Sequence, residues 1–157
     1  MNMNTGRPES AVPACAVRVA YRVPYADTDA MGYVYYGNYL TWFERCRNEL
    51  LRAAGLPYAE MEARGFMLPV LEAHVDYRLP ARYDDEVEIC GWLGEMRGVR
   101  CRVSCAVLRG GELLASGWTV HACVSATTRR PVRFPPEAAA LFAPFAAPQP
   151  VQEPASR

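Results

Sequence analysis

Apolar and polar residues alternate near the beginning of the chain, over residues 17–25. Every second position is apolar or aromatic: Val17, Val19, Tyr21, Val23 and Tyr25. A period of two places successive side chains on opposite faces of a strand. We therefore predict a half-buried strand here, which leads directly into residues 27–32.

The following segment changes to a period of three to four residues. One stripe of side chains recurs at this spacing: Leu40, Phe43, Arg47, Leu50 and Ala54. The pattern predicts a helix of about five turns, with Asn38 as its N-cap and Gly55 as its stop. A second, short helix is predicted at residues 58–64, before Gly65.

Beyond Leu71 the alternation returns in four runs, which predict strands near residues 75–79, 87–93, 99–107 and 114–124. Gly110 and Gly111 separate the last two runs, as expected of a hairpin turn. One long helix beside a series of antiparallel strands is an α+β arrangement.

Residues 1–14 and 145–157 are rich in Pro, Ala, Ser and polar residues and lack periodicity. We interpret both segments as mobile tails. The chain of 157 residues, 51% of them apolar, is long enough for one domain with its own core. We predict a single domain over residues 15–144.

Charge narrows the choice of partners. The formal net charge is zero and no block of five basic residues occurs, which argues against a nucleic-acid surface or a polybasic membrane anchor. All 17 basic residues are Arg, so Schiff-base chemistry and a P-loop lysine are excluded. We expect small molecules and further copies of the chain as partners.

The six cysteines stand at positions 15, 46, 90, 101, 105 and 123 and form no C-x-x-C pair. This spacing indicates neither a zinc site nor a redox motif, and buried free thiols in a reducing compartment are the simplest interpretation. Neither an export signal nor a membrane span is apparent. We expect a cytoplasmic protein.

The strongest candidate for chemistry is the segment Asp27-Thr28-Asp29-Ala30-Met31-Gly32, which stands just before the long helix. A helix N-terminus offers free backbone N–H groups and the positive end of the helix dipole. These stabilise an oxyanion that develops when a carbonyl is attacked. A nearby carboxylate supplies a nucleophile or a general base. The segment thus predicts acyl-transfer chemistry at a carbonyl group.

The motif D-T-D-x-x-G-x-V-Y-Y-G-N-Y-L, together with P-A-x-Y-D-D at residues 80–85, resembles the signature of the hotdog-fold acyl-CoA thioesterases. The similarity is to the group that contains 4-hydroxybenzoyl-CoA thioesterase and the short-chain acyl-CoA thioesterases associated with the Tol-Pal envelope system. It implies a curved antiparallel sheet wrapped around one long central helix. It also implies a homodimer or homotetramer that joins sheets edge to edge.

The resemblance further implies roles for individual residues. Asp29 corresponds to the catalytic carboxylate, whereas Asp27 shapes the turn, and the backbone N–H of Tyr36 polarises the thioester oxygen. In the envelope-associated subgroup a histidine commonly stands at the position of Tyr36. Asp29 is expected either to attack the thioester directly or to deprotonate a water, and these alternatives remain open.

Residues that could contact the substrate fall into two groups. Arg97, Arg129 and Arg130 stand at strand ends, where guanidinium groups could pair with the phosphates of coenzyme A. Gly32, Asn38, Met67 and Leu68 are the candidates for the substrate pocket, the last two because they lie in the loop between Gly65 and Val70. Coenzyme A would be part of the substrate, and no separate cofactor or metal is expected.

Other functions fit the sequence less well. As an EF-hand loop, the segment would carry Met31 and Asn38 where calcium ligands are needed. No G-x-S-x-G motif for a serine nucleophile occurs. Two alternatives stay open. The first is a hotdog protein that binds acyl thioesters without hydrolysis, or that hydrates an enoyl thioester; hydration calls for a positioned histidine, and only His74 or His121 could serve. The second is a scaffold near the Tol-Pal or phospholipid-synthesis systems.

Overall fold

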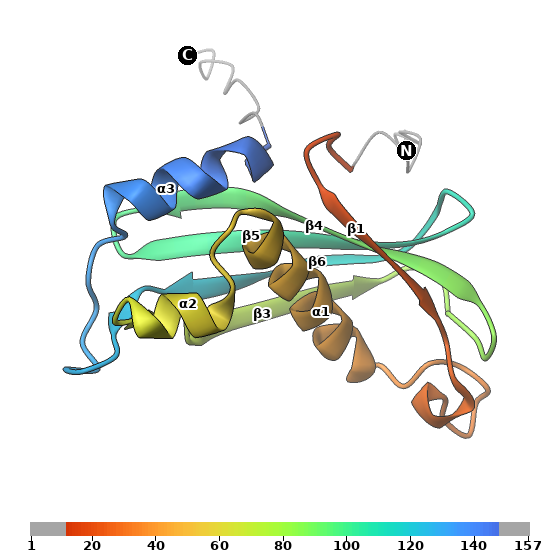
Figure 1. Cartoon of the computed structure of the whole chain (residues 1–157). Helices are drawn as coiled ribbons and strands as arrows, with labels where there is room; N and C mark the ends of the chain where they lie inside the picture. The colour runs from red at the N-terminus through yellow and green to blue at the C-terminus, as the bar shows by residue number, and fades with distance from the viewer. Residues whose placement is uncertain (1–11, 148–157) are drawn as a thin grey trace, which may run out of the picture.

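The computed structural model describes residues 12–147, which form an α+β fold (Figure 1). The main sheet has five antiparallel strands in the order β1-β4-β5-β6-β3. Its strands are β1 (Val17–Arg22), β3 (Val70–Tyr77), β4 (Glu86–Arg97), β5 (Arg100–Arg109) and β6 (Glu112–Ala122). Two short strands, β2 (Phe66–Met67) and β7 (Val124–Ser125), pair separately. β1 and β3 are therefore the edges of the main sheet.

The longest helix, α1 (Asn38–Ala53), lies across one face of the sheet (Figure 1). Shorter helices are α2 (Tyr58–Ala63) and α3 (Pro136–Phe142), with single 3₁₀ turns η2 (Tyr25–Asp27) and η3 (Ala143–Phe145). Gly55 ends α1 at a φ of 81°, and the N–H of Leu56 donates to the carbonyl of Leu51. This is the Schellman geometry that favours glycine after a helix.

The two faces of the main sheet differ in what covers them. Side chains on the helix-covered face join α1 in one hydrophobic core; from β5 these are Cys101, Val103, Cys105 and Val107. The intervening positions point to the opposite side, which we call the open face. In its middle His74, Ser104 and Trp118 stand side by side on β3, β5 and β6. The strict alternation of a pleated strand produces this division.

Most elements predicted from the sequence are confirmed. The predicted long helix corresponds to α1 and the short one to α2, and Gly110 and Gly111 join β5 to β6 with φ values of 56° and 82°. Positive φ at both positions is typical of a tight hairpin turn. Strand β3 begins at Val70, five positions before the predicted strand, and the sequence reasoning did not identify β2, β7 and α3. Two-residue strands are too short to produce a readable alternation.

The prediction of Asn38 as N-cap is wrong. Gly37 occupies the N-cap position, and Asn38 is the first residue of α1. The side-chain amide of Asn38 instead donates to the carbonyl of Asp27 at 2.9 Å. An Asn near a helix start can satisfy a loop carbonyl as well as a helix N–H.

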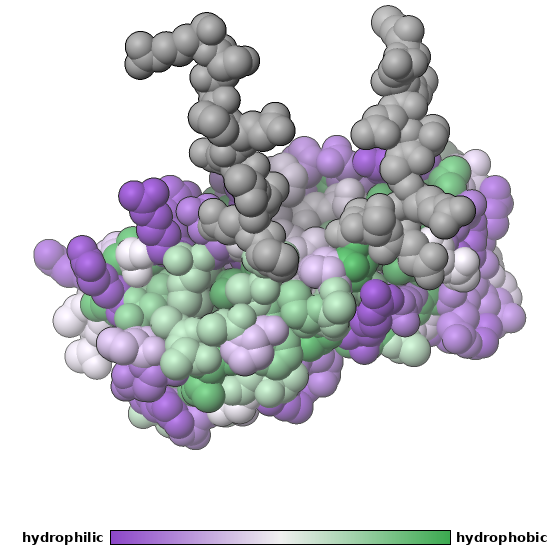
Figure 2. Space-filling model, turned by 90° about the horizontal axis from the view of Figure 1, so that it is seen from above, coloured by the Kyte–Doolittle hydropathy of each residue, from purple (hydrophilic) through white to green (hydrophobic). Residues whose placement is uncertain are grey.

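The packed chain extends beyond the predicted bounds of 15 and 144. Val12 is buried beside Cys90 and Leu108, and Phe145 packs against the main core. The remainder of the two predicted tails, residues 1–11 and 148–157, lies outside the described residues. Figure 2 shows apolar side chains gathered on the side of the molecule where α3 lies. There Ala139 is exposed and Leu141 is 37% exposed.

Candidate active site

The loop between η2 and α1 is held by hydrogen bonds to Asp27. The hydroxyl of Tyr21 donates to the Asp27 carboxylate at 2.7 Å. The Asp27 carbonyl accepts from the Tyr35 N–H at 2.8 Å and from the side-chain amide of Asn38. The carboxylate of Asp27 thus fixes the loop to β1, and its backbone carbonyl fixes the loop to the start of α1.

Asp29 is bonded differently. Its backbone closes a tight turn, because its N–H donates to the carbonyl of Tyr33 at 2.8 Å and its carbonyl accepts from the Gly32 N–H at 3.0 Å. One carboxylate oxygen, Oδ1, accepts from the Met31 N–H at 2.9 Å. Within residues 12–147 the second oxygen has no hydrogen-bond partner. Asp29 therefore presents a partly solvated, available carboxylate oxygen.

Two backbone N–H groups just before α1 are also available. Across the described part of the chain, neither the Tyr36 nor the Gly37 N–H donates a hydrogen bond. The next two residues are satisfied, since the Asn38 N–H donates to Tyr35 and the Tyr39 N–H to Tyr36. Unpaired N–H groups at a helix start add to the positive end of the helix dipole. They form a ready receptor for a negatively charged oxygen.

Asp29 and Tyr36 line the same cavity, whose volume is about 270 Å³. We call it the tyrosine-lined cavity, because four tyrosines contribute to its walls: Tyr33, Tyr36, Tyr39 and Tyr77. The other lining residues are Met31, Val34, Arg78, Leu79 and Pro80. Tyr39 belongs to α1 and Tyr77 to β3, and their rings meet edge to face at 5.1 Å. The cavity therefore opens on the helix-covered side of the sheet, at the end of edge strand β3.

Residues of the motif at 80–85 contact the loop that carries Asp29. The carbonyl of Ala81 accepts from the Val34 N–H at 2.8 Å, which ties the motif to the Asp29 loop. The Asp85 carboxylate accepts from Arg109 and from the Arg82 N–H, both at 2.8 Å. Burial raises the pKa of Asp85, but these hydrogen bonds and the nearby positive charges outweigh it and leave the pKa below its ordinary value. The motif thus acts as a rigid base for the loop.

The two histidines lie away from the tyrosine-lined cavity. His121 is fully buried, and its ring nitrogens contact the hydroxyl of Thr119 at 2.8 Å and the carbonyl of Leu68 at 3.1 Å. Burial lowers the pKa of His121 to about 4. His74 stacks on Trp118 on the open face, with a centroid separation of 4.2 Å. Neither ring lines the cavity that contains Asp29.

The other predicted pocket residues occupy different positions. Gly32, with a φ of 77°, makes the turn after Asp29, and Asn38 fixes the loop, so both support the cavity without lining it. Met67 and Leu68 belong to the segment around β2, next to β7. Arg129 follows β7, where its guanidinium lies 3.8 Å from the Met67 sulfur, and Arg130 is its exposed neighbour. Within one chain, none of these four residues lines the tyrosine-lined cavity.

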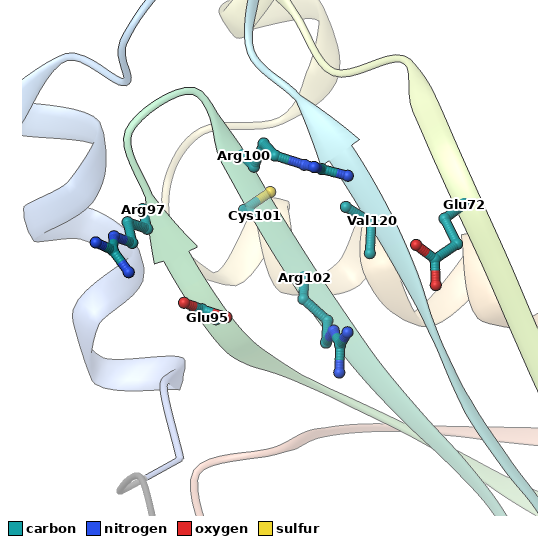
Figure 3. Close-up of a pocket in the computed structure, with 7 residues that line it drawn as sticks. All are labelled: Glu72, Glu95, Arg97, Arg100, Cys101, Arg102 and Val120. Atoms are coloured by element: carbon teal, nitrogen blue, oxygen red, sulfur yellow. The ribbon is translucent and has the colours of Figure 1, made fainter.

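Arg97 lies at a second cavity, of about 380 Å³, on the open face. Figure 3 shows this arginine-lined cavity, formed by Glu72, Glu95, Arg97, Arg100, Cys101, Arg102 and Val120. The three guanidinium groups point in different directions in this view, and that of Arg102 lies 4.7 Å from the ring of Trp118. Among the described residues, no carboxylate forms an ion pair with any of the three.

Sequence reasoning missed several residues of the tyrosine-lined cavity, above all Tyr77. It was expected only as a strand residue, and 41 positions separate it from Tyr36, whose carbonyl its hydroxyl contacts. Its alternation with Val75 indicates that the two share a face, but no local pattern shows which loop that face meets. Only the packing of β3 beside α1 brings Tyr77 to the site.

Two further properties concern the whole described region. Across residues 12–147, no group of three or more His, Cys, Asp and Glu side chains is arranged to hold a metal ion. No helix within the same residues has the length and apolar character needed to cross a membrane.

Comparison with known proteins gives a consistent result. A family model described as the thioesterase-like superfamily matches residues 23–142. The acyl-CoA thioesterase YbgC of Haemophilus influenzae is 33% identical over 122 residues, which cover 77% of this chain and 90% of the relative. A 1,4-dihydroxy-2-naphthoyl-CoA hydrolase of Synechococcus is 29% identical over 119 residues, covering 72% and 80%. The crystal structure of the hypothetical protein TT1821 from Thermus thermophilus has a TM-score of 0.77 and 35% identity, covering 82% of this chain and 98% of that one.

Proposed function

The chain belongs to the thioesterase-like superfamily, and from that premise we propose that it is an acyl-CoA thioesterase whose active site is the tyrosine-lined cavity. Its antiparallel sheet packed on α1 is the hotdog fold expected from the sequence. The observation that supports the assignment of the site is that Asp29, which has an available carboxylate oxygen, and Tyr36, whose N–H is free within residues 12–147, line the same cavity.

Hydrolysis of a thioester requires two things, an attacking oxygen and stabilisation of charge on the carbonyl oxygen. In the proposed mechanism the thioester carbonyl oxygen accepts hydrogen bonds from the N–H groups of Tyr36 and Gly37. Negative charge then develops at the helix start, where the dipole and unpaired donors stabilise it. The C–S bond breaks, and coenzyme A leaves as a thiolate that takes up a proton. Protein groups and water supply this chemistry, and coenzyme A enters as part of the substrate.

Two roles for Asp29 are compatible with this arrangement. As a nucleophile, its carboxylate would form an acyl anhydride, which water then hydrolyses. As a general base, it would take a proton from the water that attacks the thioester. Repeated turnover in ¹⁸O-water followed by mass spectrometry of the peptide with Asp29 gives the first test. Incorporation of ¹⁸O into Asp29 indicates an anhydride that water hydrolyses at its aspartyl carbonyl. An unlabelled Asp29 leaves the general base or an anhydride hydrolysed at its acyl carbonyl, and rapid quenching during a single turnover separates these two, because only the anhydride adds the mass of the acyl group to the protein.

The proposed activity is tested by measuring the thiol released from a panel of acyl-CoA esters. We expect turnover with at least one short-chain or aromatic ester. The panel should contain both classes, because the walls of four tyrosine rings suit an aromatic acyl group, and the Synechococcus relative is named for a naphthoyl substrate. A purified, folded protein that hydrolyses no member of the panel would refute the proposed function.

We also propose that the protein assembles through β3. This strand is an edge of the sheet, and apolar side chains along it are exposed, including Val70 at 51% and Leu71 at 53%. An unpaired edge of this kind is a template for a second strand. Light scattering should therefore give a homodimer or homotetramer. A stable, active monomer at micromolar concentration would contradict this proposal.

Edge-to-edge assembly would also give the remaining predicted residues a role. If two β3 strands pair antiparallel about a twofold axis, the Val70 end of one lies beside the Tyr77 end of the other. Met67, Leu68 and Arg129 of the second copy would then lie near the tyrosine-lined cavity of the first, since they precede or adjoin that end of β3. We propose Met67 and Leu68 as acyl contacts, and Arg97, Arg129 and Arg130 as contacts of the coenzyme A phosphates.

A cytoplasmic location is a further proposal. All six cysteines are free thiols in the structure, and five of them are buried. Free thiols persist most readily in a reducing compartment. Cell fractionation with an antibody to the protein tests this, and recovery in an oxidising compartment would contradict it.

A further inference from the structure

Tyr77 links the end of edge strand β3 to the loop that precedes α1. Its hydroxyl donates a hydrogen bond of 2.8 Å to the backbone carbonyl of Tyr36. Its ring lies between two others, edge to face with Tyr39 at 5.1 Å and with Tyr36 at 6.5 Å. The hydroxyl and the ring of Tyr77 therefore make separate contacts, which substitution can separate.

The carbonyl that Tyr77 contacts belongs to the peptide unit between Tyr36 and Gly37. The N–H of this same unit is the Gly37 N–H, which is free within the described residues. Since a peptide unit is planar, fixing its carbonyl also fixes the direction of its N–H. A hydrogen bond to the carbonyl also polarises the unit and strengthens the N–H as a donor.

The surroundings of Tyr77 keep its hydroxyl protonated, so that it can donate a hydrogen bond. Burial, and to a lesser extent the neighbouring Tyr36, raise the pKa of Tyr77 above its ordinary value. The phenol consequently keeps its proton throughout the neutral range and remains a donor. The Tyr36 carbonyl also accepts from the Tyr39 N–H, at 3.3 Å, so the hydroxyl of Tyr77 makes the shorter of its two contacts.

We propose that Tyr77 is a positioning residue for the oxyanion site, and that its hydroxyl holds the Tyr36–Gly37 peptide unit with its N–H directed at the thioester oxygen. This inference rests on the proposed thioesterase function and extends it to a residue of the neighbouring strand. Tyr77 acts through the peptide unit and does not itself contact the reacting atoms.

The test uses Tyr77→Phe, which removes the hydroxyl and keeps the ring. With the best acyl-CoA ester, we expect kcat to fall about 10-fold, a smaller loss than for an oxyanion donor itself, while KM stays within about two-fold. The matched control is Tyr83→Phe. Tyr83 is 59% exposed, its hydroxyl makes no hydrogen bond within residues 12–147, and its ring lies outside the cavity against Tyr25. The backbone hydrogen bond between residues 80–85 and the Asp29 loop is made by Ala81, which this control leaves in place. This control should keep wild-type kcat and KM.

A spectroscopic measurement shows whether the hydrogen bond itself is responsible. Tyr36–Gly37 is the only Tyr-Gly pair in the sequence. Labelling with carbonyl-¹³C tyrosine and ¹⁵N glycine therefore gives a single carbonyl–amide cross-peak, which reports both ends of this peptide unit. We expect the cross-peak to move in Tyr77→Phe and to stay in place in Tyr83→Phe.

The possible outcomes are distinct. A wild-type protein without thioesterase activity overturns the proposed function and this inference together. An active wild type with an equally fast Tyr77→Phe variant overturns the inference alone. A slow variant whose cross-peak does not move, or whose KM rises as much as kcat falls, shows that Tyr77 only packs, and this also overturns the inference. A lower kcat, a steady KM and a displaced cross-peak support it.

Discussion

The two faces of the main sheet each carry a cavity, and the two cavities differ in volume, in charge and in how their polar groups are held in place. The arginine-lined cavity on the open face is the larger, about 380 Å³ against 270 Å³, and carries more charge. Its guanidinium groups point apart (Figure 3). The tyrosine-lined cavity has one lining arginine, Arg78, whereas its carboxylate, on Asp29, and the turn at Tyr36 come from one short loop held at both ends.

Under the proposed function, the cavity with the smaller charge is the active site, and the amount of charge is then a poor guide to the place of catalysis. Catalysis depends on donors and carboxylates that are fixed in position before the substrate arrives. The helix-covered face provides this fixation, because α1, β3 and residues 80–85 all pack against the Asp29 loop. Of the three arginines of the arginine-lined cavity, Arg102 lies against the ring of Trp118, and within residues 12–147 none of the three forms an ion pair.

The largest effect on catalysis is expected from Asp29→Asn. We expect this variant to fold normally and to lose at least about 100-fold in kcat, because the amide keeps the shape but cannot attack or accept a proton. Asp27→Asn is the matched control; it weakens only the contact with Tyr21 and should lose less than about 10-fold. An Asp29→Asn enzyme with near wild-type kcat would remove Asp29 from the mechanism.

His121, on the helix-covered side of the sheet, is expected to make the free energy of unfolding depend on pH. His121 is neutral when folded, with a pKa of about 4, whereas an unfolded histidine titrates near 6.5. As pH falls below about 6.5, the unfolded state takes up a proton that the folded state does not, so stability decreases until about pH 4. We expect His121 to account for about 2 kcal/mol of the stability lost between pH 7 and 5.

Denaturant unfolding at both pH values measures this loss. His121→Gln should be less stable at pH 7, because it leaves a cavity and disturbs the contacts with Thr119 and Leu68, but its stability should depend less on pH. An unchanged slope in His121→Gln would show that another group causes the loss.

Loosening the loop should have an intermediate effect on catalysis. Asn38→Ala removes the hydrogen bond to the Asp27 carbonyl and keeps a good helix former in the first turn of α1. We expect kcat to fall about 10-fold and KM to change less, since the loop must be rigid mainly in the transition state. Thr41→Ala, an exposed change on the same helix, is the control. Equal kinetics for the two variants would argue against a need for loop rigidity.

The arginines allow a smaller test of whether the open face takes part at all. If Arg97 contacts coenzyme A phosphates, Arg97→Gln should raise KM for an acyl-CoA about three-fold at unchanged kcat, in line with the modest strength of an exposed charge pair. A thioester of N-acetylcysteamine, which lacks the nucleotide, should show no change. Arg102→Gln, whose partner is the ring of Trp118, should leave both constants at wild-type values. A KM equal to wild type in Arg97→Gln would exclude this contact.

The smallest effect is expected from Tyr36→Phe. The proposed donor at this position is the backbone N–H, and the phenol is 63% exposed. We therefore expect a change of less than about two-fold in kcat, as for a surface side chain. A variant as slow as Asp29→Asn would show that the hydroxyl, and not the backbone, is the essential group.

The sequence by itself determined the α+β class, both helices near the motif and all five long strands, four of them with approximate bounds, whereas the role of Asp29 stays a prediction. These features depend on local periodicity, on glycine at positions such as Gly55, and on a motif contained in a few consecutive residues. The carboxylate of Asp27 is bonded to Tyr21, as expected of a residue that shapes the turn, whereas the carboxylate of Asp29 accepts only from the Met31 N–H within residues 12–147.

The tertiary structure alone decided which distant residues meet at Asp29 and which do not. It brought Tyr77 to the carbonyl of Tyr36, tied Ala81 to Val34, and assigned Asn38 to a loop carbonyl instead of a helix cap. It also separated Arg97 from the tyrosine-lined cavity by placing it on the opposite face. Periodicity specifies the face of each element but not its neighbour, because neighbours are chosen by packing between segments far apart in the chain.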